Sequence, residues 1–408
     1  MRRLFAWMHG TLYGSFTVCD GLVAFRYEPG VCEPISISLP LSGEWAPDAP
    51  KNFLDGLLPD SGNERLRMKS ALGANSDDAF DLLDSVDAIG GLTFSLDNKC
   101  PESVSNHFAF PISEEDFRAR LDNMLVSPAA WWIANENSRF SLAGTQSKFS
   151  MAKVGDDWFW LNVSLPSTHK VKPECPPNRN AVVVESSTLD LAKLCGLQVC
   201  EHSVVNVGDS SAFVTPRFDR RFAPDGLAER LRVEDFTQSL GVSRDVKYDV
   251  ETETIIAMLK HVDPTCSLRY DWLAQFAFNV MVCNADAHAK NYSLLLEVEK
   301  VKLSPLYDGL ATWYWPQYSK ALAMLAMSVN DVWFTNEITL SDWEALARQN
   351  GLAVDKALDV VKHIATGVAA HAQSAFAEIP GLANIVLEAN RLLLEDLRCA
   401  YSVNHGEQ

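Results

Sequence analysis

The 408-residue chain lacks the features that mark exported, membrane-spanning and zinc-binding proteins. Its nine cysteines form no Cys-x-x-Cys pair, which argues against structural zinc and is typical of thiols kept reduced in a cytoplasm. No apolar run reaches the roughly eighteen residues that a membrane span needs. The first residues, MRRLFAWMHGTLYG, contain neither a long apolar stretch nor a small-residue cleavage site. We therefore expect a cytoplasmic protein with no membrane segment.

Positive charge is also scarce. The chain has 35 Lys and Arg against 53 Asp and Glu, which gives a net charge of −18. Nucleic acid phosphates repel such a chain unless it carries a local basic patch. We therefore do not expect it to bind DNA or RNA directly, and a basic partner protein is easier to accommodate.

The composition is otherwise that of a globular protein, with 47% hydrophobic and 22% charged residues. The length suits two or three domains, or one two-lobed fold with an appended module. We predict an N-terminal α+β module over residues 1–125, a strand-rich part over 126–240 and a helical lobe over 241–408. Strands followed by helices are the order of a two-lobed protein kinase, so the predicted fold class is α+β.

Some local elements are predicted more closely. The stretch PISISLPL (residues 34–41) is expected to be a strand, and residues 77–91 are expected to form a helix that ends at a Gly pair. Two helix starts carry a capping-box pair: Ser113 with Asp116, and Ser341 with Glu344.

The stretch CNADAHAKNYSLLLE (residues 283–297) places many polar groups between two apolar segments. Asp286 and Asn291 have the D-x-x-x-x-N spacing of a kinase catalytic loop, in which the Asp orients the substrate hydroxyl and the Asn holds a metal. Asp308, in SPLYDGL, lies where a kinase places the Asp that binds Mg²⁺. Carboxylate and amide oxygens are the hard ligands that Mg²⁺ requires.

Spacing alone is weak, because Asp286 by itself is more simply explained as a turn residue. The order of the segments is the stronger signal. A candidate phosphate loop, SLAGTQSK (residues 141–148), precedes Lys172 on a predicted strand and Glu185 on a predicted helix, and the catalytic-loop residues follow. In a kinase, such a lysine contacts the phosphates and such a glutamate holds the lysine.

Several short segments together resemble one family. They are LLPDSGNERLR, FDLL, GGLTF, SLAGTQSKFSM, THKVKP, PRFDRR, EDFTQSLG, NADAHAKNYS and SPLYDGL, and they run in the family's order from about residue 55 to 310. In these segments the chain resembles the HipA-type serine/threonine kinases, the toxins of bacterial HipA–HipB toxin–antitoxin pairs. The last hundred or so residues match this family only in being helical.

The resemblance implies a role for each matching residue. Asp286 is the expected catalytic base, Asn291 and Asp308 are the expected Mg²⁺ ligands, and ATP is the expected phosphate donor. Ser141 matches a serine that the family autophosphorylates, and nearly two added negative charges there should expel the loop and switch the enzyme off. The residues expected to bind the nucleotide are Ala143, Gly144, Thr145, Gln146, Ser147, Lys148, Lys172, Glu234, Asp235, Phe236, His288, Asn291, Tyr307 and Asp308.

The resemblance also implies partners. A HipB-like helix-turn-helix antitoxin would supply the DNA binding that this acidic chain lacks. The phosphorylated substrate would be an aminoacyl-tRNA synthetase, most often the glutamyl enzyme, so that translation stops and the cell becomes dormant. The N-terminal module would contact the antitoxin or brace the kinase lobes.

Two other functions stay open. A small-molecule phosphotransferase shares the D-x-x-x-x-N core but lacks the N-terminal matches. A weakly active corepressor scaffold would not need the intact catalytic-loop residues. The segment PRFDRR (residues 216–221) is either a solvated turn with salt bridges or a contact for substrate or partner. The aromatic clusters at 131–132 and 313–315 are predicted to be core.

The chain also departs from the family pattern at two positions. Thr145 replaces the more usual Ala of the phosphate loop. Gly309 follows the predicted magnesium Asp, where the family has a larger apolar residue.

Overall fold

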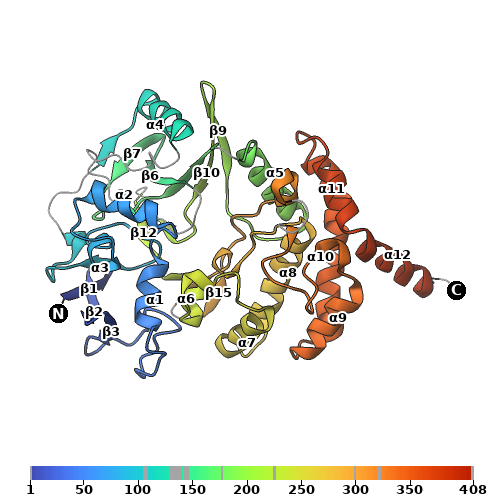
Figure 1. Cartoon of the computed structure of the whole chain (residues 1–408), viewed down its shortest axis with the longest axis horizontal. Coiled ribbons are helices and arrows are strands. Elements are labelled where there is room, and N and C mark those ends of the chain that lie inside the picture. Colours follow the sequence, from blue (N-terminus) through green and yellow to red (C-terminus); the bar gives the residue numbers. More distant parts are fainter. Residues whose placement is uncertain are drawn as a thin grey trace. The chain divides into compact units, whose positions relative to one another are not determined.

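The computed structural model describes residues 2–103, 109–127, 140–141, 147–175, 178–223, 227–297, 300–318 and 323–405, with side chains described as far as residue 399. The chain forms two compact units, each built from three separate segments (Figure 1). The first unit comprises Met1–Val182, Glu201–Val246 and Ser293–Lys302, and the second comprises Val183–Cys200, Lys247–Tyr292 and Leu303–Gln408.

The first unit begins with an antiparallel sheet in the order β3-β2-β1-β4. Its strands are β1 (Arg2–Met8), β2 (Thr11–Cys19), β3 (Leu22–Tyr27) and β4 (Thr93–Ser95). Alternate residues of β1 such as Leu4 and Ala6 are buried together with Phe16, as expected for a sheet with one covered face. The apolar core of this sheet includes residues of helix α1 (Ala49–Gly56). Helices α2 (Gly62–Leu72) and α3 (Ala79–Leu82) follow in the chain.

Two local predictions for this region are wrong. Residues 34–41 make only one isolated bridge, between Ser36 and Leu39, because the prolines in this stretch cannot donate to a ladder. Of the helix predicted over 77–91, only Ala79–Leu82 is helical. The chain after it turns at Ser85, where φ is +56°, and residues 87–90 then take part in long-range hydrogen bonds.

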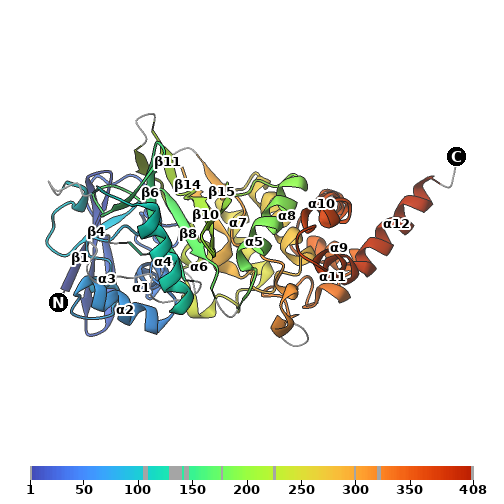
Figure 2. The same cartoon turned by 90° about the horizontal axis from the view of Figure 1, so that it is seen from above.

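The second sheet of this unit has six strands in the order β5-β7-β6-β8-β10-β9. They are β5 (Ala109–Pro111), β6 (Phe149–Val154), β7 (Asp157–Leu161), β8 (His169–Pro173), β9 (Ser203–Val207) and β10 (Ser210–Pro216). Helix α4 (Glu114–Val126) packs on β8 and β10 (Figure 2). Its predicted capping box is confirmed, since Ser113 and Asp116 bond to each other's backbone N–H.

Two smaller sheets complete the first unit. One pairs β11 (Arg220–Phe222) with β12 (Ala228–Arg230). The other has the order β13-β14-β15, with β13 (Val233–Asp235), β14 (Ser293–Leu296) and β15 (Val301–Leu303). Gly90 lies against β13 with φ of +86°, and a Cβ atom there would lie 3.0 Å from the Val233 carbonyl oxygen. Only glycine combines this backbone conformation with such a close approach.

The second unit is mainly helical. Its helices are α5 (Ala181–Leu194, whose first two residues belong to the first unit), α7 (Thr252–Val262), α8 (Ser267–Met281), α9 (Leu340–Gln349), α10 (Val354–Ala375), α11 (Leu382–Ala389) and α12 (Arg391–His405). Helix α8 packs against α7 and α10 and is buried along most of its length (Figure 1). Trp272 and Phe276 of α8 stack with centroids 5.0 Å apart, and the Phe276 ring meets Trp343 of α9.

The start of α9 differs from its prediction. The capping box uses Thr339 and Asp342 in place of Ser341 and Glu344. Contacts with distant residues explain the difference. Leu340 N donates to Asp396 of α12, and Ile338 is buried, so the helix begins at the residues that these contacts hold. Of the helices in the described ranges, none combines the length and apolar character that crossing a membrane requires. The predicted α+β class is confirmed.

Candidate active site

The loop that follows α8 is held in shape by its own backbone. Helix α8 ends at Met281, and Cys283 then adopts a positive φ of 58°, which turns the chain out of the helix. Asn284 bonds twice to Asn279. Its backbone N donates to Asn279 O, and its Nδ2 donates to Asn279 Oδ1, both at 2.9 Å. The turn therefore starts at a fixed place relative to a buried helix.

Asp286 and Asn291 are tied together within this loop. The backbone oxygen of Asp286 accepts hydrogen bonds from His288 N at 2.8 Å and from Asn291 Nδ2 at 2.9 Å. Asp286 N donates to Asn284 Oδ1 at 3.2 Å. The Asp286 carboxylate accepts a hydrogen bond from the hydroxyl of Tyr248. The two predicted residues therefore belong to one rigid turn.

Residues outside the loop, which the sequence analysis did not identify, form hydrogen bonds with its backbone. Thr312 Oγ1 accepts from Ala285 N and donates to Cys283 O, at 2.8 Å in both bonds. Ala289 N donates to Lys247 O at 3.2 Å. The loop is thus supported by neighbours on both sides that are distant in sequence.

Asp308 is connected to the same loop through Asn284, whose Nδ2 donates to the Asp308 carbonyl at 3.4 Å. The chain before Asp308 is positioned by Leu306, which exchanges backbone hydrogen bonds with Gln198 and Cys200. Asp308 itself has φ of +53°, a conformation that Asp tolerates better than most residues. The structure therefore brings Asp286, Asn291 and Asp308 together within the second unit.

Gly309 departs from the larger apolar residue of the family pattern, and the structure accounts for the small side chain. A Cβ atom at this position would lie 3.1 Å from Cδ2 of Leu189 on α5. Leu189 is fully buried and already fills this space. The neighbouring predicted residue Tyr307 donates its hydroxyl proton to the Lys290 carbonyl at 2.9 Å, which is a second link to the catalytic loop.

The donor atoms at this place fit magnesium better than a transition metal. In the part of the chain that the structure describes, no three His, Cys, Asp or Glu side chains are grouped to hold a metal. Asn291 and Asp308 offer one amide and one carboxylate. Mg²⁺ is commonly held by one or two carboxylates together with substrate phosphates and water, so this donor set suits it.

His288 lies in the same loop and is buried. Its ring meets the Tyr248 ring edge to face, with centroids 4.8 Å apart. The predicted contact of His288 with the nucleotide stays a prediction.

The predicted lysine and glutamate are both buried, in different units. Lys172 lies on β8 with 2% of its surface exposed, and its Nζ is 5.5 Å from the centre of the Phe213 ring on β10. Glu185 lies on α5 in the second unit. Their pairing stays a prediction.

The candidate phosphate loop lies partly outside the described residues, which exclude Ala143, Gly144, Thr145 and Gln146. Ser147 and Lys148 are described and lead into β6, with Lys148 buried. Burial raises the pKa of Glu64 on α2 to about 7, and the nearby charge of Lys148 acts in the opposite direction.

Ser141, the predicted phosphorylation site, has no exposed surface. Its Oγ donates to the Leu57 carbonyl at 2.8 Å, and its backbone N donates to the Asp87 carbonyl at 2.9 Å. A phosphate group cannot be added to this side chain while both bonds hold, so modification requires residues 140–141 to leave their place.

The segment expected to meet adenine directs its side chains into the protein. Glu234 Oε1 accepts hydrogen bonds from Ile37 N at 3.1 Å and from Ser239 Oγ at 2.9 Å, and burial raises the pKa of this carboxyl to about 7. Asp235 caps α6 (Phe236–Leu240) through Gln238 N, and Phe236 is fully buried. An adenine contact by this segment stays a prediction.

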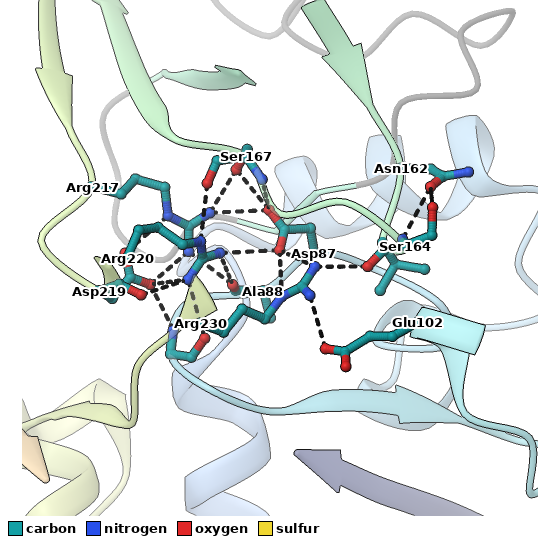
Figure 3. A network of polar contacts seen from close by, with 12 residues as sticks. Asp87, Ala88, Glu102, Asn162, Ser164, Ser167, Arg217, Asp219, Arg220 and Arg230 are labelled. Carbon is teal, nitrogen blue, oxygen red and sulfur yellow. Dashed lines mark hydrogen bonds and ion pairs between the residues drawn. The ribbon is translucent and has the colours of Figure 1, made fainter. Parts of the chain in front are cut away.

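The PRFDRR segment is not a solvated turn. Arg217, Asp219 and Arg220 are buried in the first unit, where each of the two arginines pairs with both Asp219 and Asp87 (Figure 3). Of the aromatic clusters, Trp315 is buried as predicted, and Trp313 is half-buried and donates to the Ala323 carbonyl. The pair at 131–132 lies outside the described residues.

A cavity of about 450 Å³ opens elsewhere in the first unit, lined by residues of β1, β2, β12 and β14. None of the predicted site residues lines it. Two of its charged groups, Arg232 and Glu33, pair at 2.6 Å.

Comparison with known proteins gives consistent matches over most of the chain. The HipA-like C-terminal domain family matches residues 140–374, and the HipA N-terminal domain family matches residues 4–95. The Sinorhizobium fredii protein Y4mE is 29% identical over 371 residues, which cover 87% of each chain. The serine/threonine-protein kinase toxin HipA of Shewanella oneidensis is 27% identical over 365 residues, which cover 85% of this chain and 81% of that protein.

A solved structure shares the fold. It is the complex of HipA, HipB and operator DNA from the toxin–antitoxin system of Shewanella oneidensis MR-1, and the matching chain is 24% identical. The match covers 96% of both chains with a TM-score of 0.78. The two chains therefore share the same fold.

Proposed function

Because this chain belongs to the HipA family of serine/threonine-kinase toxins, we propose that it is an ATP- and Mg²⁺-dependent protein kinase that acts as the toxin of a toxin–antitoxin pair. One observation carries the proposal. Asp286 and Asn291 are bonded to each other in one turn, and Asp308 is linked to that turn through Asn284. This is the arrangement that phosphoryl transfer needs, because catalysis there consists mainly of positioning and charge stabilisation.

Each residue then has a separate task. The Asp286 carboxylate accepts the proton of the substrate hydroxyl and aims its oxygen at the γ-phosphoryl group. Asn291 uses its Nδ2 to bond Asp286 O, so its Oδ1 is the atom that would bind Mg²⁺ together with the Asp308 carboxylate. Bound Mg²⁺ supplies charge neutralisation on the phosphates. Lys172 and the loop Ala143–Lys148 would contact the phosphates.

The substrate and partner follow from the family. We propose that the target is an aminoacyl-tRNA synthetase, with the glutamyl enzyme the first to test, and that its phosphorylation stops translation in the cytoplasm. The net charge of −18 favours a basic helix-turn-helix antitoxin as the route to DNA. The relative of known structure was solved with HipB and operator DNA.

The buried position of Ser141 supports its role as an off-switch. A phosphate adds nearly two negative charges and three acceptor oxygens, which the fully buried site beside the Leu57 carbonyl cannot accept. Phosphorylation would therefore hold residues 140–141 out of place and disrupt the loop that follows them.

The test is the intact mass of the purified full-length protein after incubation with ATP and Mg²⁺. We expect a gain of about 80 Da, one phosphate, in the unmodified protein. Asp286→Asn keeps the size of the side chain and its acceptor for Tyr248 but removes the base, so it should gain no mass. Ser141→Ala should also gain none.

The outcomes separate the parts of the proposal. A gain that survives Ser141→Ala but not Asp286→Asn would keep the kinase and move the phosphorylation site. If the protein neither gains mass nor phosphorylates purified glutamyl-tRNA synthetase, and binds no nucleotide, the kinase proposal fails. The corepressor scaffold would then be the better description.

A further inference from the structure

A buried network of ions joins Asp87 of the N-terminal module to Arg217 and to the small sheet formed by β11 and β12. The carboxylate of Asp87 is surrounded by Arg217, Arg220 and Arg230, at 3.2, 3.0 and 2.9 Å (Figure 3). Asp219 pairs with two of these arginines from the other side. All of these side chains are nearly or completely buried. Such a network is costly to assemble and is strongly destabilised when one member is removed.

Asp87 differs from Asp219 in its further hydrogen-bond partners. Its carboxylate accepts hydrogen bonds from Ser167 N at 3.1 Å and from Ser167 Oγ at 2.6 Å. Its backbone carbonyl accepts from Ser141 N, and its chain runs parallel to Phe140 in an isolated bridge. Asp219, in contrast, accepts from Gly90 N and from arginines.

These contacts fix two segments that carry predicted nucleotide ligands. Residues 140–141 lead directly into the phosphate loop. Ser167 and Thr168 lead directly into β8, on which Lys172 is buried. A single residue of the N-terminal module therefore holds the bases of both segments, and its other bonds connect it to Arg217, which follows β10.

We propose that Asp87 is a positioning residue for nucleotide binding, which keeps residues 140–141 and the segment that leads into the Lys172 strand in place relative to each other. The proposal rests on the proposed kinase function. It gives the N-terminal module a direct part in the reaction, because the module supplies the residue on which both nucleotide-binding segments rest.

The neighbouring arginines favour the ionised form of Asp87. Burial alone would raise the pKa of this carboxyl, but Arg220, Arg230 and Arg217 hold it well below its usual range.

The experiment compares two isosteric variants of the full-length protein, Asp87→Asn and Asp219→Asn. Both remove one charge from the same buried network, so both should lower the midpoint of urea unfolding. The dissociation constant of a non-hydrolysable ATP analogue with Mg²⁺ is measured by calorimetry. We expect Asp87→Asn to raise this constant about tenfold, as for the loss of hydrogen bonds to a charged group, and Asp219→Asn to change it less than about threefold.

A second pair of variants covers the case in which Asp87→Asn does not fold. Ser167→Ala removes a hydroxyl that bonds Asp87 but keeps every charge, and should raise the dissociation constant about threefold. Ser164→Ala is its control, since that hydroxyl donates to Asn162 in the same segment, and the variant should leave the constant unchanged.

If both variants of each pair weaken binding of the ATP analogue equally, the positioning role is overturned. The loss of affinity would then be explained by lower stability alone. Unchanged binding in Asp87→Asn or, if that variant does not fold, in Ser167→Ala would overturn it as well. If the unmodified protein itself does not bind the analogue, the proposed kinase function fails, and this inference fails with it.

Discussion

The hydroxyl of Tyr248 donates a hydrogen bond to Oδ1 of Asp286, across 38 positions of sequence. The Tyr248 ring packs edge to face on His288 of the same loop. A hydrogen bond to one carboxylate oxygen restricts the rotation of the carboxylate. Tyr248 is thus a positioning residue for the proposed base.

Tyr248→Phe should therefore lower the rate of phosphate transfer about tenfold at saturating ATP, which corresponds to ~1.4 kcal/mol. The KM for ATP should change little, and so should stability, because Tyr248 is 46% exposed. The control is Tyr270→Phe, whose hydroxyl accepts a bond from Ala353 N at the start of α10. A faster Tyr248→Phe enzyme would mean that the hydroxyl competes with the substrate, and would contradict this role.

Asp308→Asn should fold normally and bind Mg²⁺ more weakly, because it removes a proposed Mg²⁺ ligand. Asn tolerates the positive φ of this position as well as Asp does, but it replaces the carboxylate with a neutral amide. We expect the Mg²⁺ concentration for half-maximal activity to rise at least about tenfold, and transfer at low Mg²⁺ to fall about a hundredfold.

The matched control for this variant is Asp331→Asn, at another position of positive φ in the same unit. It should leave the Mg²⁺ dependence unchanged. A normal Mg²⁺ titration for Asp308→Asn would show that the metal ligand is another residue.

Ser141→Ala should lower the free energy of unfolding by about 1 kcal/mol, because the variant leaves the buried Leu57 carbonyl without its donor. Ser374→Ala removes the same kind of bond, from a hydroxyl to a backbone carbonyl, at an exposed place on α10, and should cost less than about 0.5 kcal/mol. Urea unfolding of both variants measures the difference. Equal costs would indicate that Ser141 is already exposed in solution.

Glu234 should make stability depend on pH in a defined direction. Burial raises the pKa of this carboxyl to about 7 in the folded protein, above the ordinary value of 4.5. The folded state therefore binds the proton more tightly than the unfolded state does. This contribution favours folding below about pH 4.5 and is lost as the pH rises through about 7.

Glu234→Gln removes this titration. The stability of the variant relative to the unmodified protein should increase by up to about 3 kcal/mol between pH 5 and pH 8, measured by urea unfolding at both values. Glu44→Gln, at an exposed carboxylate, is the control and should show no such trend. A parallel pH dependence of the Glu234 variant and the unmodified protein would contradict the assignment.

Features that depend on neighbours in sequence were predictable. The closeness of Asp286 and Asn291 follows from five positions of separation in one turn, and the structure adds the bond between them. The start of α4 was predictable because Ser113 and Asp116 satisfy each other's backbone without outside help. The family resemblance was likewise carried by short segments whose residues act together locally.

Features that depend on partners distant in sequence could not be predicted. The helix predicted over 77–91 stops after Leu82 because Asp87 and Gly90 are engaged by Arg220 and Asp219, more than a hundred positions away in sequence. The direction of the Glu234 side chain is set by Ile37 N. The support of Asp286 by Tyr248 required the turn before α7 and the loop after α8 to be placed in three dimensions.

The sequence by itself therefore determined the fold class, the family and the order of the candidate catalytic residues, because local spacing and apolar pattern encode them. The tertiary structure alone decided that Arg217, Asp219 and Arg220 form a buried ionic network, that Ser141 is buried with its hydroxyl bonded to the Leu57 carbonyl, and that Asp87 contacts both Ser141 and Ser167. Buried charges must find partners wherever the fold places them, and that placement is not written in the spacing of the residues along the chain.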